Sequence, residues 1–139
     1  YRTVDQWLGL YEVEETTVGD FARHVARKVE PFGEDAVFLM GDPSRRVGKV
    51  AVGTGCGIPT FEMLSLGADV MVQVFDRAFQ TFTRLPLVDL GANLIVVEHG
   101  VAEMPGMQNM ALHLPEMFPG VRAAFYRCEP DSRAVVAGP

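Results

Sequence analysis

One stretch, residues 93–103, constrains the fold of this 139-residue chain more than any other. It begins with Asn93 and four aliphatic residues, which is typical of a strand buried on both faces of an α/β sheet. His99 follows almost directly, and Glu103 comes four positions later, beyond a glycine. In open α/β sheets, ligands bind at the carboxyl ends of the strands. We therefore expect His99 and Glu103 to belong to a ligand site.

The rest of the chain alternates between short apolar runs and segments with helical periodicity. The strand at 47–52, the glycine-rich loop at 53–57, the helix at 59–66 and the strand at 70–74 form a βαβ unit, which requires parallel strands and a right-handed crossover. We therefore predict a single α/β domain over residues 1–139, with a mixed, largely parallel sheet. The other expected strands are 36–40, 94–97 and 121–126, and the other expected helices are 21–29, 76–84 and 105–118.

Both ends of the chain are less clearly patterned. Residues 1–15 show no strong periodicity, and residues 132–139 are expected to be a tail. Apolar residues in the last expected helix have the spacing of a buried face, namely Met107, Met110, Ala111, Leu114 and Met117.

Composition narrows the class of protein. The net charge is -6 and no stripe of Lys and Arg is present, so we expect no nucleic-acid partner. No apolar run approaches the ~20 residues of a membrane span, so we expect no membrane partner. Cys56 and Cys128 lack the spacing of a metal or redox motif, which indicates a reducing, cytoplasmic location. The remaining partner class is a small-molecule substrate, whose identity the sequence does not indicate.

The glycine-rich loop, Gly53 to Gly57, allows two interpretations. Glycines between a strand and a helix let backbone N–H groups approach a phosphate, and Asp76 follows the next strand, where a ribose-binding acid is expected. This arrangement also resembles the first motif of S-adenosylmethionine-dependent methyltransferases. However, Ile58 occupies the position of the last glycine of a dinucleotide fingerprint. The alternative is a tight turn that packs the helix against the sheet.

His99 and Glu103 also allow two interpretations. An imidazole and a carboxylate suit a divalent transition metal such as zinc, iron, manganese or nickel. Alternatively, the two side chains satisfy each other in a non-catalytic, oligomerising domain. Glu98 is expected to be an outer partner of the imidazole or to face solvent, while His24 and His113 are expected on helix surfaces.

Several motifs together resemble the second half of a Nif-three-like protein, over roughly residues 9–130. The matching segments are 41–43, 47–57, 67–70, 90–94 and 98–103. The family is also described as related to type one GTP cyclohydrolase. The resemblance implies that His99 and Glu103 supply two ligands of a dinuclear metal site. It further implies a cytoplasmic, ring-like homo-oligomer built from dimers, and metal-assisted hydrolysis.

The chain departs from the family pattern in two respects. The usual Thr-Gly-Asp segment with a downstream histidine is replaced by residues 73–79, which contain neither the glycine nor the histidine. In addition, the other metal ligands of the family, a histidine pair and an aspartate, belong to its first half. Because metal sites generally need at least three protein ligands per ion, we expect the site to be incomplete within this chain.

Overall fold

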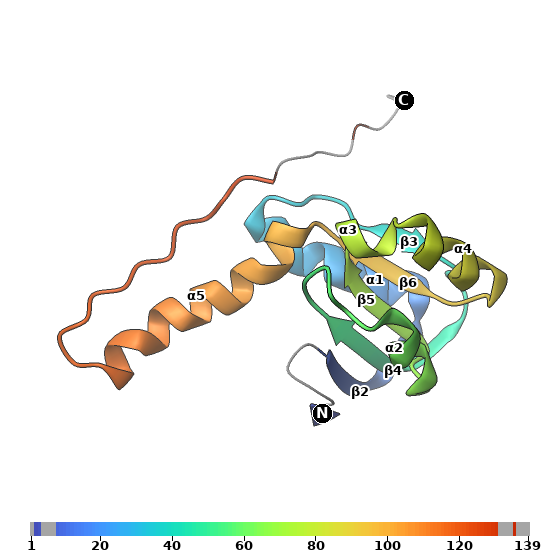
Figure 1. The fold of residues 1–139 in the computed structure, drawn as a ribbon, viewed down its shortest axis with the longest axis horizontal. Coiled ribbons are helices and arrows are strands. Elements are labelled where there is room, and N and C mark those ends of the chain that lie inside the picture. Colours follow the sequence, from blue (N-terminus) through green and yellow to red (C-terminus); the bar gives the residue numbers. More distant parts are fainter. Residues whose placement is uncertain (1, 4–7, 131–134, 136–139) are drawn as a thin grey trace.

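A six-stranded mixed sheet organises the computed structural model, which describes residues 2–3, 8–130 and 135 (Figure 1). The order across the sheet is β1-β2-β4-β5-β6-β3. The strands are β1 (Arg2–Thr3), β2 (Leu8–Thr17), β3 (Phe38–Met40), β4 (Arg46–Gly53), β5 (Val70–Val74) and β6 (Leu94–Val97). The helices are α1 (Val18–Val29), the short 3-10 helix η1 (Glu30–Phe32), α2 (Thr60–Ser65), α3 (Phe75–Ala78), α4 (Thr81–Asp89) and α5 (His99–Met117).

The mixed α/β class and the β4–α2–β5 unit are confirmed, because β4, β5 and β6 pair in parallel. The expectation of a largely parallel sheet was wrong, since the other three pairings are antiparallel. The main cause is β2, which falls in the weakly patterned start of the chain and pairs with β4. Its register shifts between Glu12 and Thr16, and its exposed polar residues hide the alternation expected of a strand.

Helices cover both faces of the sheet, and the central strands are buried between them. Alternation along β6 directs Leu94 and Val96 to one core and Ile95 to the other. The first core includes residues of α2 and α4, and the second includes Val18 and Ala22 of α1. All four residues of β6 are buried, and each such aliphatic side chain contributes roughly 1.5–3 kcal/mol. The strand that leads into His99 is therefore held rigidly.

Two helix predictions were wrong in their bounds. The helix expected at 76–84 is divided into α3 and α4, and Pro86 lies inside α4. The helix expected at 105–118 begins earlier, at His99, because the Glu98 side chain caps it. Among the described residues, no helix combines the length and apolar character needed to cross a membrane.

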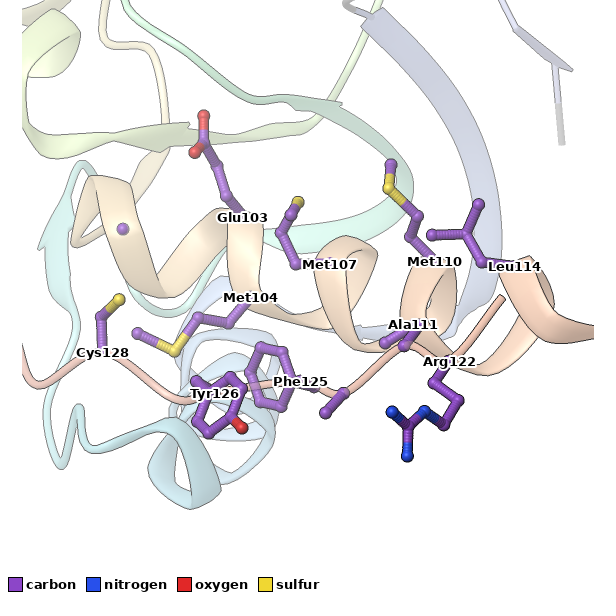
Figure 2. A pocket seen from close by; sticks show the side chains of 13 residues that line it. Glu103, Met104, Met107, Met110, Ala111, Leu114, Arg122, Phe125, Tyr126 and Cys128 are labelled. Atoms are coloured by element: carbon purple, nitrogen blue, oxygen red, sulfur yellow. The ribbon is translucent and has the colours of Figure 1, made fainter. Parts of the chain in front are cut away.

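The C-terminal part of α5 extends beyond the sheet, and the segment at 121–130 returns along it (Figure 1). The predicted buried face was therefore wrong, since Met107, Met110 and Met117 are 52%, 52% and 68% exposed. The strand expected at 121–126 was also wrong, because this segment faces a helix instead of a sheet edge and forms no ladder. The two segments enclose a groove of about 610 Å³, in which Met104 faces Phe125 (Figure 2). The expected tail lies outside the described residues, apart from Val135.

Candidate functional site

The parallel register of β5 and β6 brings Asp76 and His99 together. The last pair of this ladder is Val74 with Val97, and each functional residue lies two positions beyond its member of the pair. Parallel strands end at the same edge of a sheet, so the two side chains lie next to each other there. The Nδ1 atom of His99 is 3.0 Å from Oδ1 of Asp76. The sequence analysis had assigned Asp76 to a different site, the glycine-rich loop.

Glu103 approaches the same imidazole from the other side. It lies one helical turn after His99 on α5, and residues with this spacing share a helix face. Its Oε1 atom is 3.2 Å from Nε2 of His99. The side chains of His99, Asp76 and Glu103 are 33%, 45% and 53% exposed. Both ring nitrogens therefore contact a carboxylate while the cluster remains open to solvent.

The turn that carries His99 is held by two further carboxylates. The Val101 backbone N–H donates to Oε2 of Glu98 at 2.7 Å, which caps α5. The Glu98 backbone N–H donates to both oxygens of Glu34, at 3.0 and 3.1 Å. Glu98 therefore caps the helix, and the carboxylate beside Nδ1 of His99 is that of Asp76. Glu34 was not predicted, because it lies 64 residues from its partner and belongs to no motif.

Burial and neighbouring charges shift two pKa values in this region. Burial raises the pKa of Glu34 to about 7; the N–H of Glu98 opposes this, and the charges of Glu98 and Asp35 add to it. For His99, burial lowers the pKa, but the hydrogen bonds and charges of Asp76 and Glu103 outweigh it, so the pKa is raised overall. An imidazolium at a helix N-terminus is disfavoured by the helix dipole, so these carboxylates are what stabilise the charged ring.

The raised pKa of Glu34 predicts a pH-dependent loss of stability. Between 4.5, the ordinary value, and about 7, the folded protein binds more protons than the unfolded chain. The stability due to this group is therefore greatest below pH 4.5 and falls as the pH rises through 7. We expect Glu34→Gln, which keeps an acceptor for the Glu98 N–H, to be more stable than wild type at pH 8. Because Glu34 is only partly buried, the expected gain is only about 1 kcal/mol.

Urea unfolding at several pH values would measure this effect. The difference in unfolding free energy between Glu34→Gln and wild type should vanish at low pH and grow through the titration of Glu34. Glu12→Gln, at an exposed position of β2, is the matched control and should show no such growth. A constant difference between Glu34→Gln and wild type at all pH values would contradict the assignment.

The glycine-rich loop has few features of a phosphate site. The helix that follows it, α2, has six residues, and no side chain caps its first turn. Gly55 adopts a positive φ of 82°, which favours glycine. The turn is therefore sufficient to explain this glycine without a bound phosphate. Ile58 is buried, and Asp76 contacts His99. No geometric feature therefore favours the nucleotide or S-adenosylmethionine alternative.

The residues around His99 fit part of a metal site. The 3.2 Å between Nε2 of His99 and Oε1 of Glu103 is compatible with two ligands of one ion, whose bonds to such atoms are roughly 2.0–2.2 Å. Within the described ranges, no group of three or more His, Cys, Asp or Glu side chains is placed to hold a metal ion. Two donors are thus present, and a complete ligand set requires more.

The chain is thus an α/β protein with a mixed sheet. Its polar cluster of Asp76, His99 and Glu103 lies at the carboxyl ends of the parallel strands β5 and β6. The chain belongs to the Duf34/NIF3 (NGG1p interacting factor 3) family, whose sequence profile matches residues 6–132. The resemblance found in the sequence is thereby confirmed. A search of curated proteins finds no match.

Solved structures share the fold. The Bacillus cereus protein related to NIF3 is 26% identical, with a TM-score of 0.62 over 79% of this chain and 29% of its own. The Staphylococcus aureus protein SA1388 is 22% identical, with a TM-score of 0.64 over 79% of this chain and 35% of its own. The protein ybgI, of unknown function, is 16% identical, with a TM-score of 0.66 over 81% of this chain and 44% of its own. The chain thus matches less than half the length of each.

Proposed function

We propose that this chain supplies two ligands, Nε2 of His99 and the carboxylate of Glu103, to the metal site of a metal-dependent hydrolase. The observation that carries the proposal is the 3.2 Å contact between these groups at the carboxyl end of β6, on a side open to solvent. Membership of the Duf34/NIF3 family supports it. A zinc, iron, manganese or nickel ion suits an imidazole together with a carboxylate.

The chemistry of such a site follows from its residues. When bound, a divalent metal lowers the pKa of a coordinated water and so supplies hydroxide near neutral pH. His99 would contribute a neutral nitrogen and Glu103 a negative oxygen. Glu103 also lines the groove of about 610 Å³ beside α5, which has the size of a small-molecule site and an apolar wall for the organic part of a substrate.

The missing ligands are expected outside these 139 residues, in the part of the fold that the longer solved structures have in addition. The ring-like homo-oligomer of dimers and the cytoplasmic location stay predictions from the resemblance. The chain alone should therefore bind metal weakly.

Elemental analysis after purification without chelators would test the proposal, on this chain and on a longer natural protein that contains it. We expect two metal equivalents per subunit in the longer protein and far less than one in this chain. A longer protein that is folded, active in no hydrolase assay and free of metal would contradict the proposal.

A second candidate function is structural, because both nitrogens of His99 already contact carboxylates. In this case the cluster only stabilises the turn into α5 within an oligomerising domain. Ion pairs this exposed contribute at most about 1 kcal/mol, and a cation is unfavourable at a helix N-terminus. Absence of metal from the longer protein, together with an unchanged fold and assembly in His99→Ala, would favour this function.

A further inference from the structure

We propose that a second copy of this chain docks on an exposed apolar surface formed by β3, α3 and α4, which we call the α4 surface. Its members are large apolar side chains with exposed fractions between 37% and 66%, namely Phe38, Phe75, Phe79, Phe82, Leu85 and Val88. The family resemblance implies an assembly of copies but assigns no surface to it. The inference goes beyond the proposed function and does not depend on a metal.

The sequence of α4 explains why apolar side chains point outward. Thr83 and Leu87 are one helical turn apart, and both are fully buried. Phe82, Leu85 and Val88 follow one another at intervals of three residues, which places them together on the opposite side of the helix. A surface helix normally carries polar residues on its outer side. The helix α4 therefore has a second apolar side, which folding of a single copy leaves in water.

Three phenylalanines extend the α4 surface to the edge of the sheet. The ring centroids of Phe75 and Phe79 lie 4.7 Å apart, and that of Phe38 lies 6.1 and 5.5 Å from them. Phe38, Phe79 and Val88 also line one hollow of about 200 Å³, which joins the aromatic cluster to α4. Phe38 belongs to β3, the last strand in the order of the sheet, and natural proteins protect such apolar edges by covering them.

The area of the α4 surface matches what a dimer needs. An aromatic side chain offers roughly 150–250 Å² of surface, so the exposed parts of these phenylalanines, with Leu85 and Val88, amount to roughly 550 Å². A standard interface buries about 800 Å² per partner, and about 65% of a homodimer interface is apolar. The α4 surface therefore supplies the apolar part of one standard interface.

The position and charges of the α4 surface favour a second copy as its occupant. In Figure 1, α4 lies at the right of the sheet and the protruding end of α5 lies at the left. The part of the longer proteins that would complete the metal site is expected near Glu103 on α5, so it leaves the α4 surface uncovered. Arg84 and Asp89 are exposed on α4, so charges of both signs accompany the surface and a second copy is not repelled.

A two-fold axis explains how the α4 surface can pair with itself, because a symmetric dimer uses the same surface of both copies. When two α4 helices run antiparallel with Leu85 at the axis, each Leu85 contacts its counterpart. Phe82 of each copy then faces Val88 of the other, which pairs a large side chain with a small one. Asp89 faces Thr81, so no two like charges meet along this line.

Analytical ultracentrifugation of this chain would test the inference. We expect a dimer at micromolar concentrations, which is at the weak end for an interface of this size. Leu85→Glu places two carboxylates at the axis, so it should weaken the dimer by more than about 100-fold. Leu112→Glu is the matched control, since Leu112 is 65% exposed but lies on α5, and it should leave the dimer intact. Amide NMR spectra would show that both variants are folded.

Disulfide cross-linking would test the symmetry of the dimer. In a chain whose exposed Cys56 and Cys128 are replaced by serine, Leu85→Cys should form a covalent dimer on oxidation, and Leu112→Cys should not. A wild-type chain that stays monomeric at several hundred micromolar would overturn the inference. Equal effects of the substitutions at Leu85 and Leu112, in either experiment, would overturn it too. Neither measurement involves a metal, so the result is independent of the test of the proposed function.

Discussion

His99→Ala is expected to abolish metal binding while leaving the fold almost unchanged. Removing an outer carboxylate partner of a metal-bound histidine weakens binding by roughly 10–100-fold, so removing the ligand itself should cost more than about 100-fold. The unfolding free energy should change by less than about 1 kcal/mol, because the ion pairs of His99 are partly exposed. Zinc titration of the substitution in the longer protein and urea unfolding of the same variant would measure both effects.

His113→Ala is the matched control for this prediction. His113 also lies on α5 and also contacts a carboxylate, that of Glu116, but it lies near the opposite end of the helix. The His113→Ala substitution should leave zinc affinity unchanged. Equal losses of zinc affinity in the two variants would indicate nonspecific surface binding and would contradict a site at His99.

Gly41→Ala is expected to destabilise the fold by about 3–4 kcal/mol, the largest stability effect predicted for a single methyl group here. Gly41 follows β3 with a φ of 106°, where an L side chain is strained. A Cβ would lie against Oδ1 of Asn93 and 2.9 Å from the backbone oxygen of Ala92. These atoms cannot move away easily, because Asn93 is buried directly before β6.

The contacts of Asn93 explain why this clash would also disturb hydrogen bonds to two other segments. Its Oδ1 accepts from the Asp42 backbone N–H at 3.0 Å, and its Nδ2 donates to the Asp69 backbone oxygen at 2.9 Å. One buried amide thus joins the turn after β3 to the loop before β5. Displacing it would leave buried polar groups without partners, each at a cost of about 1–3 kcal/mol.

Gly120→Ala separates the strain from the clash. Gly120 has nearly the same φ, 99°, but a Cβ there would meet nothing within 4 Å. It should cost only about 1–2 kcal/mol, the conformational part of the effect. Denaturant unfolding of both variants would measure the difference, and equal losses would show that the clash with Asn93 contributes nothing.

The candidate site also shows which contacts a local sequence pattern can predict. The proximity of His99 and Glu103 was predicted because both belong to one short stretch, in which a buried strand ends and a helix begins. The βαβ unit and the mixed α/β class were predicted for the same reason: apolar periodicity and glycine positions are local properties. The start of α5 was predicted less accurately. The helix begins at the Glu98 cap and includes Pro105 and Pro115, whereas the predicted helix began at Pro105.

Long-range pairing lies beyond such local patterns. Asp76 was assigned to the glycine-rich loop because both follow the pattern of a nucleotide site, and only the register of Val74 with Val97 places it beside His99. Glu34 had no motif at all, yet it binds the turn that carries the imidazole.

The local sequence thus determined that a strand is followed by a turn and a helix, and that this helix carries an imidazole and a carboxylate four residues apart. Only the tertiary structure decided which other carboxylates surround that imidazole and which apolar helix faces remain exposed. The physical reason is that hydrophobic periodicity records whether a side chain is suited to burial, whereas strand order and register depend on the packing of the whole sheet.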